Sequence, residues 1–204
     1  MDESLITFVK QELNFDCLLV LCGLPATGKT GVGRIISRIK DYPILQSDLI
    51  RKEIIGVDDI LNEELASDEQ NRLRVYDLMF DRIDEVLKKH LGLILDATFF
   101  LQSLRVRAAG AAVAHQLSLI IIETVCPQEV AIRRIQGRNK INYESNALTE
   151  RAYFNNKRIF QPIDIRDIGR SYPDLNIIYL VVDTTSDSFE DWVVVKIQSG
   201  KGGN

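Results

Sequence analysis

Short, continuous apolar runs alternate along this chain with longer segments whose apolar residues recur every three or four positions. The apolar runs predict strands buried on both faces, at residues 17–22, 44–45, 91–95, 119–125 and 176–182. The periodic segments predict helices at residues 3–13, 28–40, 47–54, 67–90, 101–116, 148–160 and 186–198, with a further helix opened by Pro127. Because strands alternate with helices, the fold class is α/β with a mostly parallel sheet.

No linker or internal repeat divides the chain, so we expect a single domain over residues 1–198. Residues 136–150 include a polar stretch without apolar periodicity, which favours a mobile loop that serves as a lid. The glycine-rich end of the sequence, residues 199–204, is expected to be a flexible tail.

The composition is typical of a soluble globular protein, because 46% of the residues are hydrophobic and 26% are charged. The formal net charge of -4 provides no overall attraction to nucleic acid. No apolar run approaches the roughly 20 residues that a membrane-spanning helix needs. The three cysteines form no C-x-x-C pair, which fits a reduced, cytoplasmic compartment.

The most specific motif follows the first apolar run, where GLPATGKT matches the phosphate-binding pattern G-x-x-x-x-G-K-[ST] at every fixed position. Its glycines let the backbone curl so that N–H groups point at phosphate oxygens. Lys29 is expected to reach the β- and γ-phosphates, and the Thr30 hydroxyl to ligate Mg²⁺. A helix from Gly28 onward adds the positive end of its dipole. With ATP and Mg²⁺ as cofactors, the expected nucleotide-binding residues are Gly23, Leu24, Pro25, Ala26, Thr27, Gly28, Lys29, Thr30 and Gly31.

Two aspartates follow the second and third predicted strands, at the sheet edge where ligands of α/β proteins bind. Asp48, in SDLIR, has the position of a base that accepts the proton of an attacking hydroxyl, or of a helix cap. Arg51 lies one helical turn further on and is suited to hold a phosphate or carboxylate of the acceptor. Asp96 ends the run LGLILD and is expected to order Mg²⁺ through water or to contact the acceptor.

Arg134 and Arg138 are four residues apart, so they share one helix face beside the polar loop. Arginines on a closing loop can neutralise charge that develops on a transferred phosphoryl group. The alternative is a basic face that contacts only solvent. We expect Lys29, Asp48, Arg134 and Arg138 to form the catalytic set.

The segments GLPATGKT, SDLIR, LILDAT and CPQEVAIRRIQGR occur in this order within residues 17–182. Together they resemble a family of P-loop kinases that is similar to polynucleotide 5′-hydroxyl kinases and, more loosely, to zeta toxins, gluconate kinases and chloramphenicol phosphotransferases. The resemblance implies a three-layer α/β/α P-loop NTPase fold, with a five-stranded parallel sheet in the order 2-3-1-4-5 and a helical lid. It also implies that Asp48 is the general base, that Arg51 binds the acceptor, that Arg134 and Arg138 are lid arginines, and that residues 183–185 lie near the adenine.

These features predict an ATP-dependent kinase that transfers the γ-phosphate to a hydroxyl of a small molecule or of a polynucleotide 5′ end. The alternative is a nucleotide-binding switch or ATPase module without a hydroxyl acceptor. A guanine-specific switch is disfavoured, because the nearest match to N-K-x-D, at residues 138–142, lacks the aspartate. The acidic residues that follow Lys52 favour a small-molecule acceptor over nucleic acid.

Overall fold

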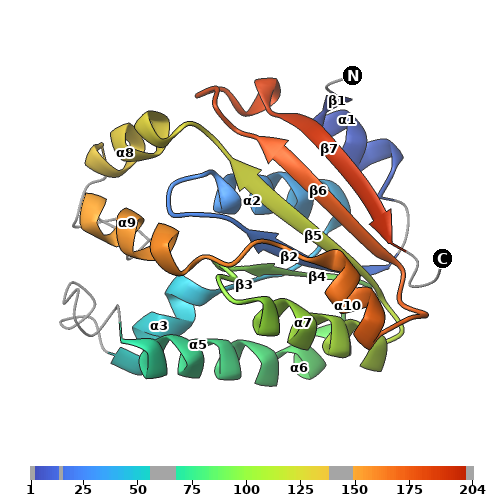
Figure 1. Cartoon of the computed structure of the whole chain (residues 1–204). Coiled ribbons are helices and arrows are strands. Elements are labelled where there is room, and N and C mark those ends of the chain that lie inside the picture. The colour runs from blue at the N-terminus through green and yellow to red at the C-terminus, as the bar shows by residue number, and fades with distance from the viewer. Residues whose placement is uncertain (1–2, 14–15, 56–67, 138–148, 201–204) are drawn as a thin grey trace.

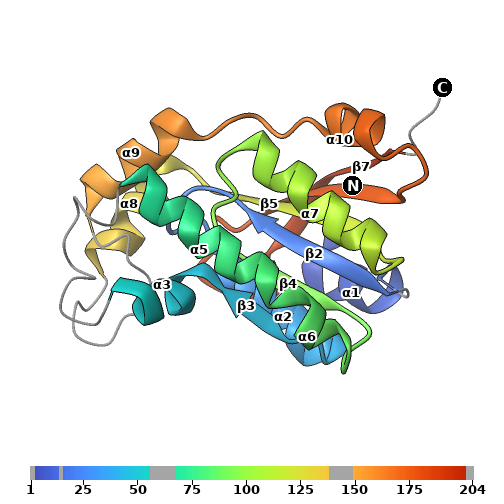
Figure 2. The same cartoon turned by 90° about the horizontal axis from the view of Figure 1, so that it is seen from below.

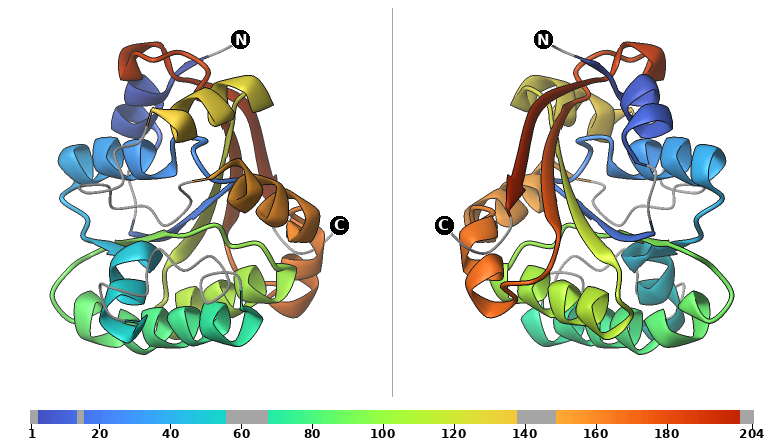
Figure 3. Two further views of the ribbon diagram at one scale, coloured as in Figure 1. Left: turned by 90° about the vertical axis from the view of Figure 1, so that its left-hand side faces the viewer. Right: turned by 90° about the vertical axis from the view of Figure 1, so that its right-hand side faces the viewer.

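The computed structural model describes residues 3–13, 16–55, 68–137 and 149–200. In this part of the chain, a sheet of seven strands has helices on both faces (Figure 1 and Figure 3). Across the sheet the order is β1-β7-β6-β5-β2-β4-β3. The strands are β1 (Glu3–Ser4), β2 (Cys17–Cys22), β3 (Ile44–Gln46), β4 (Leu93–Asp96), β5 (Ser118–Val125), β6 (Ile177–Asp183) and β7 (Val193–Gly200).

The helices form two outer layers and a small group beyond the strand ends. One face of the sheet carries α1 (Leu5–Gln11) and α2 (Lys29–Lys40). Figure 2 shows the other face, which is covered by α3 (Ser47–Ile55), α5 (Glu69–Asp81), α6 (Ile83–Leu87), α7 (Gln102–Ala114) and α10 (Ile165–Ser171). The helices α8 (Gln128–Gln136) and α9 (Glu150–Ile159) pack together past the ends of the strands (Figure 1). Among the described residues, no helix has the length and apolar character to cross a membrane.

The continuous apolar runs are explained by burial of the central strands on both faces. In β2, Leu18 and Val20 join the core beneath α5 and α7, whereas Leu19 and Leu21 join the core beneath α1 and α2. All four side chains are fully buried. Since neighbouring residues of a strand point to opposite faces, a strand between two helical layers must be apolar at every position.

The expected five-stranded, all-parallel sheet was wrong, because the sheet is mixed and has seven strands in the described part of the chain. The five strands β3, β4, β2, β5 and β6 run parallel to one another, so the order 2-3-1-4-5 describes only the parallel part of the sheet. β7 is antiparallel to β6, and β1 is antiparallel to β7. The three-layer α/β/α arrangement itself is confirmed.

The helix expected at residues 186–198 was also wrong. This segment forms a short 3-10 helix, η1 (Phe189–Asp191), followed by β7. Val193, Val194, Val195 and Ile197 are β-branched, which favours extended backbone, and β6 supplies the hydrogen-bonding partner. β7 continues to Gly200, so the first two residues of the expected tail belong to the sheet, and the others lie outside the described residues.

The remaining elements differ from expectation mainly at their boundaries. The long helix predicted at residues 67–90 divides into α5 and α6 at Arg82, and α10 had no counterpart in the prediction. The predicted lid at residues 136–150 falls largely outside the described residues. Its two ends are joined, because Gln136 Nε2 donates a hydrogen bond to Glu150 Oε1 at 2.7 Å.

The topology brings the carboxyl ends of the parallel strands to one edge of the sheet (Figure 1). The loop that follows β2, the start of α3 after β3, and the segments that follow β4, β5 and β6 all lie at this edge. This edge of an α/β sheet is where ligands bind.

Candidate active site

The loop at residues 23–30 connects the end of β2 to the start of α2, and its two fixed glycines are required by geometry. Gly28 caps α2 with φ 88°, and Gly23 has φ 136°. A Cβ added at Gly23 would lie 2.7 Å from the carbonyl oxygen of Thr124. Glycine adopts these conformations without strain and permits the close approach of the neighbouring strand.

Lys29 opens α2, and its side chain folds back over the loop. Its Nζ donates hydrogen bonds to the carbonyl oxygens of Gly23, at 3.0 Å, and Leu24, at 2.8 Å. The ammonium charge and the amino end of a helix therefore lie at the same place. Both features attract phosphate.

Threonines at the ends of β5 and β6 hold the loop from behind. Thr124 and Thr27 share a hydrogen bond of 2.7 Å between their hydroxyl oxygens. The Thr184 hydroxyl donates to the carbonyl oxygen of Thr27 at 2.8 Å. Both threonines are buried. Thr184 belongs to the segment expected near the adenine, whereas Thr124 was not singled out from the sequence, where its signal is a hydroxyl near the end of an otherwise apolar strand.

Trp192, the single tryptophan of the chain, packs against the start of α2. A Cβ added at Gly31 would lie 2.6 Å from the outer ring of this indole. The indole N–H donates to the carbonyl oxygen of Ser186 at 2.9 Å, and the ring meets Phe189 edge to face. The indole thereby joins α2 to the loop that follows β6.

Asp96 connects the phosphate-binding loop to the strand on the other side of β4. Its carboxylate accepts a hydrogen bond from the Thr30 hydroxyl at 2.7 Å and another from the side-chain amide of Gln46 at 3.3 Å. Asp96 is 6% exposed. A hydroxyl and a carboxylate are the hard oxygen donors that Mg²⁺ accepts beside the phosphates of a nucleotide, so these residues fit that ion. Gln46 was not predicted, because an amide at a strand end is common.

Asp48 and Arg51 lie on α3, which begins directly after β3. Asp48 is in the first turn of the helix, two residues after Gln46, and both Asp48 and Arg51 are half-buried. The structure therefore brings the predicted base and the predicted acceptor-binding arginine to the sheet edge that holds Asp96.

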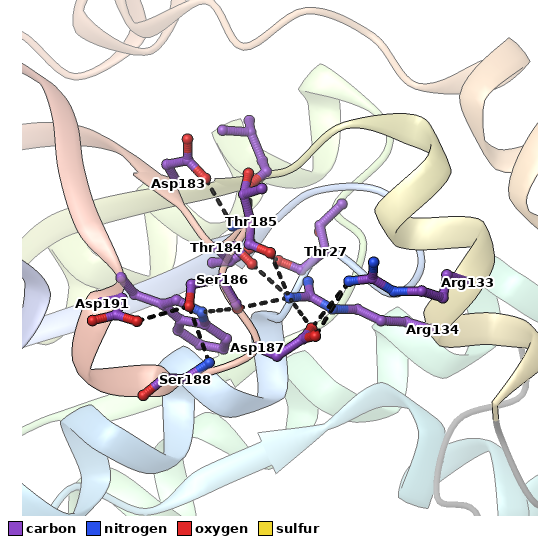
Figure 4. A network of polar contacts seen from close by, with 12 residues as sticks. Thr27, Arg133, Arg134, Asp183, Thr184, Thr185, Ser186, Asp187, Ser188 and Asp191 are labelled. Carbon is purple, nitrogen blue, oxygen red and sulfur yellow. Dashed lines mark hydrogen bonds and ion pairs between the residues drawn. The ribbon is translucent and has the colours of Figure 1, made fainter.

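Arg134 lies on α8 with its guanidinium group against the loop that follows β6 (Figure 4). Its Nη2 donates to the carbonyl oxygens of Thr184, at 2.7 Å, and Ser186, at 2.9 Å. Both Arg134 and Arg133 also form ion pairs with the exposed Asp187, at 3.6 Å and 3.3 Å respectively. Among the described residues, the buried Nη1 of Arg134 has no hydrogen-bond partner. This arginine contacts the segment expected near the adenine, and Arg138 lies outside the described residues.

Two further groups lie near the site, on β2 and β5. The Glu123 carboxylate accepts a hydrogen bond from the Tyr179 hydroxyl. Cys22 is fully buried, and burial raises the pKa of its thiol to about 12. The thiol therefore stays neutral near pH 7, which argues against ready chemical modification.

A phosphate-binding loop between a central strand and a helix of a three-layer α/β/α domain defines a P-loop nucleotide-binding protein. Residues 18–163 match the family described as AAA domain, and the chain belongs to that family.

The chain is also similar to two proteins of known name and to two solved structures. A cytidylate kinase of Pyrobaculum islandicum is 25% identical over 189 residues, which cover 88% of this chain and 90% of the relative. A probable fructose-2,6-bisphosphatase of Schizosaccharomyces pombe is 32% identical over 121 residues, or 56% of this chain, but these span only 29% of that protein.

The solved structures are a gluconokinase from Sinorhizobium meliloti 1021 and a sugar kinase from Janibacter sp. HTCC2649, each with a TM-score of 0.53. Their sequence identities are 15% and 13%. The matches cover 84% and 81% of this chain, and 85% and 84% of the respective structures. These structures support a P-loop kinase fold. The finer resemblance to polynucleotide kinases and zeta toxins stays a prediction.

Proposed function

We propose that this protein is a kinase that uses ATP and Mg²⁺ to phosphorylate a hydroxyl group of an acceptor. The observation that carries the proposal is the contact between the Thr30 hydroxyl and the Asp96 carboxylate, at 2.7 Å. This contact joins the phosphate-binding loop to the strand end beside which α3 presents Asp48. A phosphoryl donor site and a potential base thus share one edge of the sheet.

The donor half of the site would use the loop at residues 23–31. Its backbone and Lys29 would bind the phosphates, and Thr30 and Asp96 would hold Mg²⁺. Bound magnesium neutralises charge on the phosphate oxygens as the phosphoryl group is transferred. Arg134 donates hydrogen bonds to the carbonyl oxygens of Thr184 and Ser186. These contacts support a role for Arg134 in organising the part of the site that binds the nucleotide.

The acceptor half would use α3. Asp48 would accept the proton of the attacking hydroxyl, and Arg51, one turn later, would orient the acceptor. Arg138, which lies outside the described residues, would act from the lid. Positioning and charge neutralisation provide most of the catalysis in phosphoryl transfer, so this division between two halves suits the reaction.

The names of the related kinases support a small-molecule acceptor, since they refer to cytidylate, gluconate and sugar. The net charge of -4 also gives little support to a polynucleotide acceptor. A polynucleotide 5′ end remains the second candidate acceptor, on the sequence resemblance alone. The competing function is an ATPase or switch module, which would consume or bind nucleotide without an acceptor.

The test is a screen of ATP consumption against sugars, sugar acids, nucleosides, antibiotics and oligonucleotides with 5′-hydroxyl ends. We expect one acceptor class to stimulate ADP release. Lys29→Met should abolish ATP binding, whereas the exposed Lys10→Met on α1 should have no effect. Asp48→Asn should slow turnover by about 10²–10⁴ and spare ATP affinity. Equal ADP release with and without every acceptor would favour the ATPase module.

A further inference from the structure

Tyr153, on α9, has a buried ring and a hydroxyl group that the packing of the helix does not use. The residue is 3% exposed. With Ala131 and Ile135 of α8 it forms a small core, separate from the two cores on the faces of the sheet. Within the described part of the chain, its hydroxyl makes no hydrogen bond, and its oxygen is not one of the buried unpaired atoms. The hydroxyl is therefore the part of this side chain that reaches solvent.

The small core lies directly against the phosphate-binding loop. Leu24 and Ala26 of that loop pack against it, together with Cys126 from the segment that follows β5. Ala26 has φ 64°, a backbone conformation that residues other than glycine adopt rarely. Such a conformation persists where the surroundings over-determine it. Here the core that contains Tyr153 provides that packing.

The same turn of the loop carries the ammonium group of Lys29. The carbonyl oxygen of Leu24 accepts hydrogen bonds from Lys29 Nζ and from the Thr27 hydroxyl, each at 2.8 Å. The lysine of a phosphate-binding loop reaches the β- and γ-phosphates. The amino end of α2 begins at the other end of the loop, after Gly28. The terminal phosphate would therefore lie over the turn at residues 24–26, beside the small core.

Contacts at two points along α9 fix the position of Tyr153. Thr149 caps the helix, because its hydroxyl accepts a hydrogen bond from the backbone N–H of Ala152 at 3.1 Å. Nearly one turn after Tyr153, the side-chain oxygen of Asn156 accepts a hydrogen bond from Arg72 on α5. The helix lies past the carboxyl ends of the strands, next to α8 (Figure 1). Tyr153 is thus held beside the loop by the helix that carries it.

The free hydroxyl is a hydrogen-bond donor at neutral pH. Burial raises the pKa of Tyr153, and the neighbouring Cys126 thiol and Glu129 carboxylate raise it further. The phenol therefore keeps its proton. Glu129 is exposed in the first turn of α8, and no hydrogen bond joins it to the hydroxyl. A phosphate oxygen is a charged acceptor, with which a donor forms a stronger hydrogen bond than with a neutral one.

We propose that the Tyr153 hydroxyl donates a hydrogen bond to the γ-phosphate of the bound nucleotide and thereby favours ATP over ADP, an inference that rests on the proposed use of ATP. The ring supplies the position, through its packing in the small core. The hydroxyl supplies the selectivity, because ADP lacks the phosphate that it contacts.

The test measures nucleotide affinity by isothermal titration calorimetry on the full-length protein with Mg²⁺. The two ligands are a non-hydrolysable ATP analogue and ADP. Tyr153→Phe removes the hydroxyl and keeps the ring. Tyr172→Phe is the matched control, since Tyr172 caps the carboxyl end of α10 beside Ser118, where β5 begins, at the opposite end of the strands from the loop.

We expect Tyr153→Phe to weaken binding of the analogue by about 10- to 100-fold, as loss of a hydrogen bond to a charged group does. Its affinity for ADP should equal that of the wild type, and Tyr172→Phe should bind both ligands normally. The thermal midpoint of nucleotide-free Tyr153→Phe should also match that of the wild type, because the hydroxyl has no hydrogen-bond partner in the described part of the chain.

Three results would overturn this inference: unchanged affinity of Tyr153→Phe for the analogue, an equal loss for the analogue and ADP, or a lower thermal midpoint without nucleotide. The last would show that the hydroxyl serves the fold. If the wild type binds neither nucleotide, the proposed kinase function fails. If the wild type binds both and Tyr153→Phe behaves identically, only the role of Tyr153 fails.

Discussion

Replacing Gly31 by alanine should reveal how tightly Trp192 packs on the phosphate-binding helix. The new Cβ would lie 2.6 Å and 2.9 Å from two carbons of the outer indole ring, distances too short for any carbon–carbon contact. Overpacking of this kind costs about 1–3 kcal/mol in the free energy of unfolding. Replacing glycine by alanine within a helix by itself stabilises the fold by about 0.5–1 kcal/mol. The net expectation is a loss of about 0–2.5 kcal/mol.

The effect of Gly31→Ala on the free energy of unfolding should change sign when the indole is removed. Phenylalanine at position 192 lacks the outer ring that the new methyl group meets, so Gly31→Ala should stabilise Trp192→Phe by about 0.5–1 kcal/mol. The double-mutant cycle over these two positions then gives a coupling energy of about 1–3 kcal/mol. Unfolding in urea, followed by circular dichroism because the only tryptophan is altered, measures all four proteins.

A coupling below about 0.5 kcal/mol, within the error of additive effects, would refute this packing argument. Nucleotide affinity provides a second measurement. Because the indole N–H is bonded to Ser186, displacement of the ring should also weaken ATP binding in Gly31→Ala. The double variant should recover part of that affinity.

Two further predictions concern Asp96 and the buried thiols. Asp96→Asn keeps the shape of the side chain but removes its charge. The Mg²⁺ concentration needed for half-maximal turnover should therefore rise by about 10- to 100-fold. An unchanged Mg²⁺ requirement would exclude Asp96 from the metal site. Cys17 and Cys22, whose thiol pKa values burial raises to about 12, should resist alkylation at pH 8 until denaturant unfolds the chain, as peptide mapping by mass spectrometry can verify. Rapid labelling of native Cys22 would contradict its burial.

The parts of the fold that could be predicted are those set by local pattern. The parallel strands could be predicted because a strand buried on both faces, such as β2, has apolar residues at every position. The phosphate-binding loop could be predicted because Gly23 and Gly28 adopt positive φ angles, which a local sequence motif can specify. β7 was missed because its residues were included in the helix expected at residues 186–198. Its partner strand, β6, provides hydrogen bonds that no local sequence pattern records.

The parts of the site that could not be predicted depend on contacts between distant residues. Thr124 is an ordinary strand-end threonine until the fold places it beside Thr27. The residues 183–185 were expected near the adenine, but the hydrogen bond from Thr184 to the Thr27 carbonyl depends on the folded structure. Gln46 is an ordinary strand-end amide until the fold brings it to the Asp96 carboxylate, 3.3 Å away. Burial and partner choice, rather than residue type, separate these residues from their neighbours.

This difference bears on how the two halves of the proposed site specify their ligands. The donor half consists mainly of one continuous loop, so its ability to bind phosphates can be predicted from residues 23–31. Such a loop suits any nucleoside triphosphate. The acceptor half draws on α3, α5 and the segment after β4, which are joined by contacts such as the one between Tyr76 and Phe99. Substitutions in those helices could therefore change the acceptor while the phosphate-binding loop is preserved.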